Sequence, residues 1–266
     1  MDIEHISPSR TDTWKSCAMK YKLRYHLKTP APEPEKPYFT YGKIIHKIAE
    51  EYIRNRGEKS LGEVATALRQ GEILLDDRPS PPLPTGYGSK IGKHLSSIER
   101  LTEKIGFGGE LEWKFEIDLD PPNKKLLVGV IDRLMETSKG YFILDYKTTK
   151  KGGKFQKTPR TIKNDLQLRC YCRAVQITFG TKAEDIEAGL YYVDGTKSGT
   201  SLVRTRFTQE SLLAAEKELL QAYNAIQNKN PDTVRGTIGW HCDYCDYASL
   251  CSEMRIRKPN LPPALR

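Results

Sequence analysis

The segments GVIDR (residues 129–133) and ILDYKT (residues 143–148) decide the expected fold. Each is an apolar run of strand length with charged residues at its end. Between them, Ser138-Lys139-Gly140 is typical of a hairpin turn, so residues 126–135 and 141–149 are predicted to form neighbouring strands. The middle of the chain is therefore expected to hold a β-hairpin.

The acidic residues of this hairpin are predicted to converge. Side chains alternate between the two faces of a strand, so Asp145 and Lys147 should share one face and Tyr146 the other. The hairpin would bring Asp132 alongside Asp145. Two converging carboxylates suit a hard divalent cation such as Mg²⁺, and a neighbouring lysine could orient a water molecule or offset phosphate charge. The alternative is a charged outer sheet face with a cross-strand salt bridge.

Helical patterns precede the hairpin, and strands and helices follow it. Apolar spacing predicts helices at 9–27, 41–56, 61–75, 89–105, 162–179 and 208–228, and strands at 110–119, 186–193 and 201–207. Glu112, in the strand before the hairpin, is interpreted as a supporting acid or a solvated charge and is left outside the catalytic set. This order of elements predicts an α/β or α+β core with a helical N-terminal part.

Three of the six cysteines form a C-x2-C-x5-C pattern at Cys242, Cys245 and Cys251. Two thiolates separated by two residues can wrap one metal centre, which needs a fourth ligand. Cys17, alone in a polar stretch, is the first candidate for that ligand, and His241 is the rival. The spacing leaves zinc and an iron–sulfur cluster both open, and three free thiols are the remaining alternative.

Composition narrows the class of protein. The 266 residues are 38% hydrophobic and 29% charged, with a net charge of +9, which fits a folded chain of one large domain, alone or with a subdomain. No stretch is long and apolar enough for a membrane span, and the first ten residues lack the apolar segment of a signal peptide. A cytoplasmic protein is expected. The basic residues within 147–169 favour a phosphate-backbone partner, with a solvated loop as the alternative.

Taken together, these motifs resemble the PD-(D/E)XK nuclease superfamily, specifically its RecB-like branch. The segment YGKIIH (41–46) resembles the helix that carries the upstream histidine of that branch, and DLQLRCY (165–171) resembles its Q-x-x-x-Y motif. Residues 9–25 resemble its opening helix with one cysteine. The resemblance runs from about residue 7 to residue 251 and is greatest to CRISPR-associated RecB-like exonucleases and the nuclease domain of AddB.

The resemblance implies an α/β restriction-endonuclease-like fold, in which helices flank a central mixed sheet. It implies a single nuclease domain over residues 1–266. Within it, a helical part would span 7–109, the nuclease core 110–230, and a cysteine segment 237–252 would close onto Cys17. The implied activity is metal-dependent hydrolysis of DNA, as an exonuclease on single-stranded ends, in a pathway such as DNA repair. A non-cleaving nucleic-acid-binding module with a structural iron–sulfur or zinc site is the alternative.

The resemblance also assigns roles to residues. Asp132, Asp145 and the Tyr146 carbonyl would bind Mg²⁺ or Mn²⁺, Lys147 would position water or stabilise the transition state, and His46 would contact metal or phosphate. The supporting residues would hold Lys147 or contact DNA; they are Gln167, Tyr171, Lys150, Lys151 and Lys154. Cys17, Cys242, Cys245 and Cys251 would hold a [4Fe–4S] cluster, with zinc as the less favoured alternative.

Overall fold

The computed structural model describes residues 1–257 apart from 2, 33, 151, 197, 198 and 200. The chain divides into two compact units. The sheet unit contains residues 36–114 and 130–212. The cysteine unit contains residues 1–35, 115–129 and the described residues from 213 onward. Lys151, one of the predicted DNA-binding residues, lies outside the described part.

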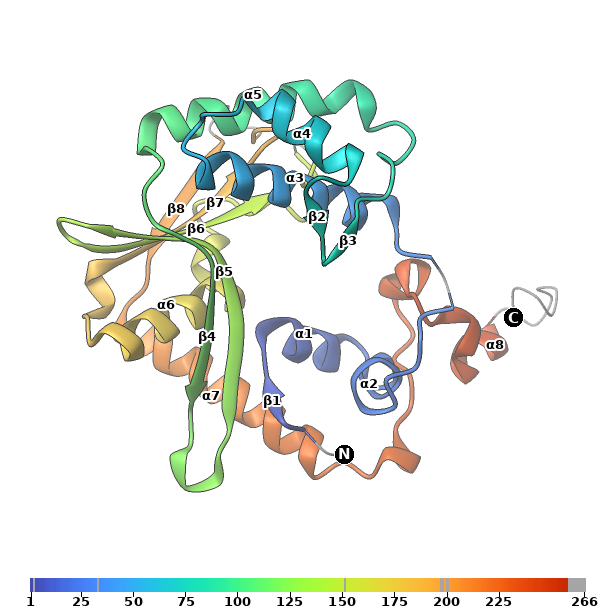
Figure 1. The fold of residues 1–266 in the computed structure, drawn as a ribbon. Coiled ribbons are helices and arrows are strands. Elements are labelled where there is room, and N and C mark those ends of the chain that lie inside the picture. The colour runs from blue at the N-terminus through green and yellow to red at the C-terminus, as the bar shows by residue number, and fades with distance from the viewer. Residues whose placement is uncertain (2, 33, 151, 197–198, 200, 258–266) are drawn as a thin grey trace. The chain divides into compact units, whose positions relative to one another are not determined.

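A mixed sheet of six strands forms the centre of the fold (Figure 1). Its strands are β1 (His5–Ile6), β4 (Glu110–Asp118), β5 (Leu126–Thr137), β6 (Gly140–Lys147), β7 (Ile186–Tyr192) and β8 (Leu202–Arg206). The order is β1-β5-β6-β7-β8, and β4 pairs with β5 off this path. The β6–β7 pair is parallel, whereas β5–β6 and β7–β8 are antiparallel. The predicted strands and the central hairpin are therefore confirmed.

The turn of this hairpin requires glycine. Gly140 has a φ of +115°, and a Cβ added there would lie 2.2 Å from the carbonyl oxygen of Asp185. The antiparallel ladder starts at this turn with Thr137 opposite Gly140 and runs to Arg133 opposite Leu144. The turn therefore fixes which residues face each other along both strands.

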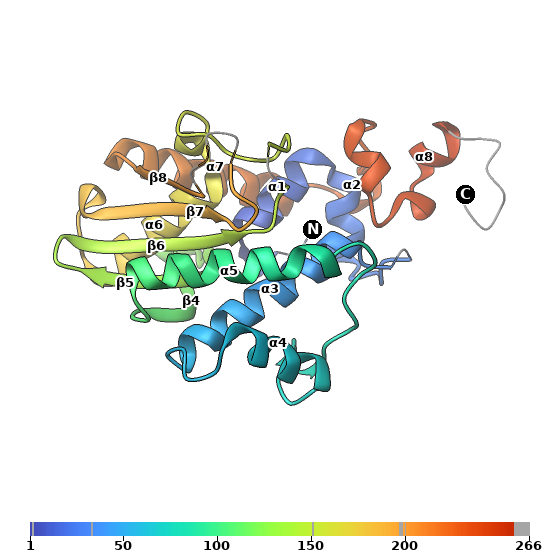
Figure 2. The same ribbon diagram turned by 90° about the horizontal axis from the view of Figure 1, so that it is seen from above.

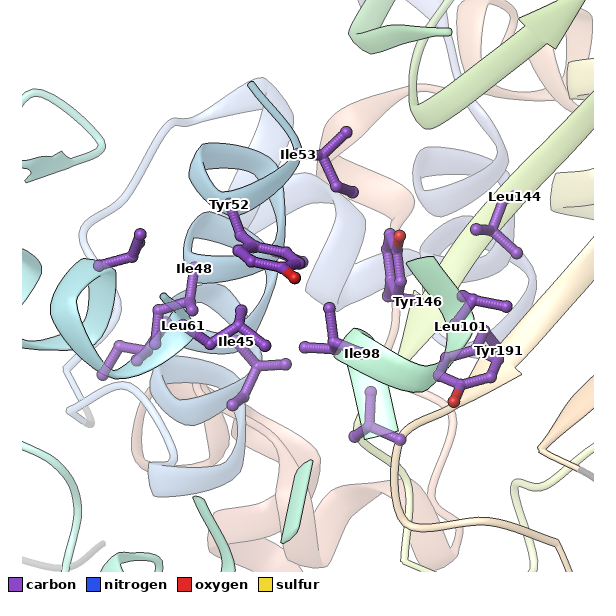
Figure 3. Close-up of a cluster of buried hydrophobic side chains, with 14 of the residues drawn as sticks. Ile45, Ile48, Tyr52, Ile53, Leu61, Ile98, Leu101, Leu144, Tyr146 and Tyr191 are labelled. Carbon is purple, nitrogen blue, oxygen red and sulfur yellow. The ribbon is translucent and has the colours of Figure 1, made fainter. Parts of the chain in front are cut away.

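Helices cover both faces of the strands in the sheet unit. The helices α3 (Pro37–Arg54), α4 (Leu61–Gln70) and α5 (Gly88–Ile105) lie on one face, and α6 (Leu166–Phe179) lies on the other (Figures 1 and 2). Ile45 and Ile48 of α3 bury their side chains with Leu144 and Tyr146 of β6 in one core (Figure 3). On the opposite face, the Tyr141 ring stacks on Phe179 of α6, with 4.6 Å between ring centroids.

Four predicted helices have different bounds in the structure. The helix expected from residue 41 begins at Pro37, and the helix expected over 162–179 begins at Leu166, after a 3₁₀ turn at Ile162–Asn164. The helix expected over 9–27 breaks at Cys17, whose extended backbone (φ −162°, ψ 109°) separates α1 (Pro8–Ser16) from α2 (Ala18–Tyr21) and a π-helical turn at Lys22–His26. The helix expected over 61–75 ends at Gln70, because Gly71 adopts a left-handed conformation that terminates it. Leu74–Leu75 then form β2, paired with β3 (Arg78–Pro79).

The remaining helices belong to the end of the chain. The helix α7 (Gln209–Gln227) begins in the sheet unit and continues in the cysteine unit, and short 3₁₀ turns lead to α8 (Ser252–Arg257). Within the described residues, no helix is long and apolar enough to cross a bilayer.

Candidate active site

The end of the β5–β6 ladder brings two carboxylates together. Asp132 and Asp145 are the residues immediately beyond the last pair, Arg133 opposite Leu144. The Asp132 Oδ2 atom accepts a hydrogen bond of 2.7 Å from the backbone N–H of Tyr146. Asp145 is only 2% exposed. The strand pairing thus produces the juxtaposition that the hairpin predicted.

A lysine on the same strand neutralises the buried carboxylate. The Lys147 Nζ atom lies 2.7 Å from Oδ2 of Asp145, two positions back along β6. The Lys147 ammonium also donates to Oε1 of Gln167 at 3.1 Å, and the Gln167 Nε2 donates to the Tyr171 hydroxyl at 2.7 Å. Gln167 and Tyr171, four positions apart, therefore share one face of α6 and form a chain of contacts that ends on Lys147.

His46 reaches this site from α3. Its Nδ1 atom is 3.3 Å from Oδ2 of Asp132, and its ring meets the Tyr146 ring edge-on at 6.1 Å. The apolar side chains of α3 that enter the core place the histidine at the edge of the buried face. Burial opposes the charged imidazolium, but the Asp132 carboxylate outweighs this effect and raises the pKa of His46 to about 9.

The pKa values of the two carboxylates are shifted in opposite directions. Burial raises the pKa of Asp145 to about 6, and the charge of Asp132 adds to this effect while Lys147 opposes it. For Asp132, burial also disfavours the charged form, but His46, Lys147 and the Tyr146 N–H hold its pKa below the usual range. Buried groups with separated pKa values are a frequent property of catalytic sites.

Glu112, predicted to be either a supporting acid or a solvated charge, interacts electrostatically with Asp132 and His46 of this cluster. It lies on β4 with a φ of +49°, a left-handed conformation that is rare for a residue with a side chain. Burial, followed by the charges of Asp132 and Glu50, raises the pKa of Glu112 to about 7. The sequence feature that pointed to Glu112 was an acidic residue between Leu111 and Trp113, in the strand before the hairpin.

Arg133 was missed, although it follows Asp132 directly. Its side chain is fully buried, and it donates to the carbonyl oxygens of Gly106 and Gly108 at 2.6 to 3.0 Å. The guanidinium therefore ties β5 to the loop that enters β4 and supports the strand that carries Asp132. A charged residue inside an otherwise apolar strand was the sequence feature that could have indicated a buried role for Arg133.

The donor set of the cluster suits a hard cation. Carboxylate and carbonyl oxygens are the ligands that Mg²⁺ takes in proteins. The N–H and C=O of one strand residue point to the same edge, so the Tyr146 carbonyl lies on the edge where its N–H meets Asp132. Among the described residues, no three His, Cys, Asp or Glu side chains are placed to bind one metal ion as they stand. Lys147 and His46 face these carboxylates instead.

The four predicted cluster ligands, each in the described part of the chain, lie around one cavity of the cysteine unit, although no three of them are close enough to bind one metal ion as they stand. Cys17, Cys242, Cys245 and Cys251 line one cavity, together with Met19, Leu23 and His241. Burial raises the pKa of the Cys245 and Cys251 thiols, and the nearby Cys17 adds to both shifts. In Figure 1 the C-terminal segment, in red, lies beside α2. The six cysteines, all among the described residues, form no disulfide.

The remaining residues that the sequence singled out lie on α6, in the loop after β6 and near the cysteine cavity. His241, the rival ligand, lies 2.8 Å from the Thr237 carbonyl oxygen through Nε2. Cys170 and Cys172, the two cysteines outside the predicted cluster, are buried on α6 as small core residues. Lys150 and Lys154 lie in the loop after β6, and Lys154 contacts the exposed Phe155 ring at 5.0 Å.

Comparison with known proteins supplies the family. Residues 5–252 match the family model described as the PD-(D/E)XK nuclease superfamily. The chain belongs to this superfamily. The expected family and its α/β fold are thereby confirmed.

Two curated relatives are named as ATP-dependent helicase/nuclease subunits. The protein from Bacillus velezensis is 33% identical over 155 residues, which are 55% of this chain and 12% of that protein. The protein from Bacillus licheniformis is 26% identical over 169 residues, 58% of this chain and 14% of that protein. The chain thus spans only a small part of these relatives. A solved structure from Eubacterium rectale, named "Putative exonuclease", has a TM-score of 0.53 at 14% identity and covers 92% of this chain and 88% of its own.

Proposed function

We propose that this protein hydrolyses phosphodiester bonds of DNA with a divalent cation and acts as an exonuclease on single-stranded ends. The observation that carries the proposal is the assembly of Asp132, Asp145, Lys147 and His46 at the end of one hairpin. Binding of nucleic acid alone does not need two converging carboxylates with a lysine paired to the buried one. The relatives named helicase/nuclease support the same reaction class.

The residues have distinct tasks in this proposal. Asp132, Asp145 and the Tyr146 carbonyl would hold Mg²⁺ or Mn²⁺, which when bound polarises the phosphate and lowers the pKa of its water. Lys147, held by Gln167, keeps a positive charge where negative charge develops in the transition state. In the metal-free site Asp132 raises the pKa of His46 to about 9, and the imidazole lies where it can contact the metal or a phosphate oxygen. Lys150, Lys151 and Lys154 supply the backbone-binding charge.

The proposal includes a structural [4Fe–4S] cluster on the four cysteines. Its support is the family resemblance together with the single cavity that all four cysteines line. Such a cluster would join α2 to the C-terminal segment and restrain chain ends that are far apart in sequence. Zinc is the alternative occupant, and measurement of iron, acid-labile sulfide and zinc in anaerobically purified protein distinguishes the two. DNA repair stays a prediction of the resemblance.

The decisive experiment is cleavage of end-labelled single-stranded DNA with Mn²⁺ or Mg²⁺ by the wild type and by Asp145→Ala. We expect the variant to lose cleavage and to retain DNA binding. Glu136→Ala is the matched control, because Glu136 is an exposed carboxylate at the other end of the same hairpin. A cluster-loaded wild type that binds DNA without cutting it would contradict the proposal and support the non-cleaving module.

A further inference from the structure

One face of α3 forms a continuous strip that leads to the candidate active site. Phe39, Lys43 and His46 are separated by four and three residues, so they lie above one another on the same side of the helix. The distance from Phe39 to His46 along the helix axis is about 10 Å, from seven residues at 1.5 Å each. We call Tyr38, Phe39, Gly42 and Lys43 the α3 strip.

The strip begins with two exposed aromatic side chains. Phe39 is 53% exposed and Tyr38 is 42% exposed, and their ring centroids are 4.6 Å apart at an angle of 48°. The opposite side of α3 buries Ile45 and Ile48 in the core (Figure 3). Core packing therefore explains the apolar residues of that side, whereas the two aromatic rings at the start of the strip are exposed to solvent.

The middle of the strip passes beside the end of β6. A Cβ added to Gly42 would lie 3.4 Å from Oγ1 of Thr148, the residue that follows Lys147. The absence of a side chain at position 42 thus lowers the helix surface next to the site. Lys43 pairs with Asp76 at 3.2 Å, but the Asp76 side chain is 70% exposed. An exposed pair of this kind contributes little, so a phosphate group can replace the carboxylate.

We propose that the α3 strip is the track along which a single strand of nucleic acid reaches the site. Unpaired bases stack on Phe39 and Tyr38, the Lys43 ammonium contacts a backbone phosphate, and the strand then passes Gly42 toward His46. A duplex would hide the base faces that the aromatic pair needs, whereas stacking on aromatic side chains is the usual way to hold single strands. This inference rests on the proposed function and names the residues that guide its single-stranded substrate.

Abasic oligonucleotides test the stacking directly. Binding is measured by fluorescence anisotropy in the Asp145→Ala background, with single-stranded oligonucleotides that carry one abasic site at successive positions. Stacking is worth about 1 to 3 kcal/mol per base, so we expect one or two positions at which the abasic site weakens binding roughly 5- to 150-fold. Addition of Phe39→Ala should weaken binding of the intact strand similarly and remove the effect of the abasic site there.

The controls separate stacking from other effects. Phe39→Trp should restore both the affinity and the abasic effect, because it keeps an aromatic face. Phe179→Ala truncates an aromatic residue that is 40% exposed at the far end of α6 from Gln167 and should change neither. Binding of blunt duplex DNA should respond little to Phe39→Ala. Thermal unfolding checks that each variant is folded.

The inference is overturned if the Tyr38→Ala/Phe39→Ala variant binds every oligonucleotide as its parent does, or if the abasic effect persists in it. An aromatic pair that serves a protein partner instead would give this result. The wild-type cleavage assay decides the proposed function separately. Cleavage without the abasic pattern would reject only the strip, whereas the abasic pattern without cleavage would reject only the nuclease.

Discussion

The Lys147 ammonium lies 2.7 Å from the Asp145 carboxylate, two positions away on the same strand. The residue between them, Tyr146, points its side chain into the core on the opposite face and its N–H toward Asp132. A stretch of three residues therefore contributes a carboxylate, a backbone contact to the second carboxylate, and a cation.

Replacement of Lys147 should change how Asp145 binds a cation. Lys147 lowers the pKa of Asp145, which burial raises to about 6, so Lys147→Met should raise that pKa further. The fall in Mn²⁺ affinity on acidification should then begin at a higher pH than in the wild type, as calorimetry without DNA can measure. Cleavage should fall at least about 100-fold. Lys147→Arg retains the charge and should keep the wild-type pH dependence of Mn²⁺ binding; an unchanged profile in Lys147→Met would refute the coupling.

The contacts from Tyr171 through Gln167 to Lys147 predict a positioning effect. Gln167→Leu removes a hydrogen-bond partner of Lys147 and should lower kcat about 10-fold with DNA affinity retained. Tyr171→Phe removes the acceptor for Gln167 and should have a smaller effect. Because both act on the same lysine, the double variant should be no worse than Gln167→Leu. Gln176→Leu, on the same helix, serves as the control, and additive losses would show independent roles.

Glu112 should make the metal-free protein less stable as the pH rises. Its folded pKa of about 7 exceeds the ordinary value of 4.5, so the folded state holds the proton more tightly. The resulting stability is present below pH 4.5 and is lost as the pH rises through 7. Glu112→Gln removes this loss and should be more stable than the wild type at pH 8 by about 1 to 3 kcal/mol.

Unfolding curves in EDTA between pH 4.5 and 8 measure this difference. Asp145 titrates in the same direction, but it is present in both proteins and its effect cancels in the comparison. Glu110→Gln, an exposed position on the same strand, should follow the wild type. Parallel curves for wild type and Glu112→Gln would rule out the raised pKa.

Cys17 should control the occupancy of the cysteine cavity. Cys17→Ser removes the ligand contributed by the N-terminal segment, so we expect iron and acid-labile sulfide to fall together and the visible absorption to be lost. Cys172→Ala, at a buried thiol of α6, should retain both. Equal iron content in the two variants, or zinc in place of iron in the wild type, would contradict the cluster assignment.

Arg133 should contribute to the stability of the fold, because its buried guanidinium binds two backbone carbonyl groups. Arg133→Met leaves the carbonyl oxygens of Gly106 and Gly108 without their donors, and we expect unfolding to become easier by about 2 to 4 kcal/mol. Chemical denaturation measures this change. Arg204→Met is the matched control, because the Arg204 side chain is 47% exposed. An equal change in both variants would show that burial of Arg133 is not the reason.

The sequence predicted those parts of the fold that local patterns determine. The hairpin was predicted from two apolar runs and a glycine turn, and the Q-x-x-x-Y resemblance gave Gln167 and Tyr171 as residues that hold Lys147 or contact DNA. Cys17 was expected inside a continuous helix, because its extended backbone lies between two segments that each have helical patterns. The raised pKa of Glu112 depends on its burial and on charges from other elements, and its backbone is left-handed. Neither property can be predicted from the neighbouring sequence.

The pairing of the two strands also limits how the chain can vary in length. Because the ladder runs in register from Thr137 opposite Gly140 to Arg133 opposite Leu144, a residue inserted into or deleted from either strand would slip one strand past the other. A slip of one residue exchanges the faces of a strand and would carry Asp132 to the opposite side of the sheet from Asp145. The even pairing of β5 with β6 is thus a chemical requirement of the site, and a single-residue insertion within either strand should abolish it.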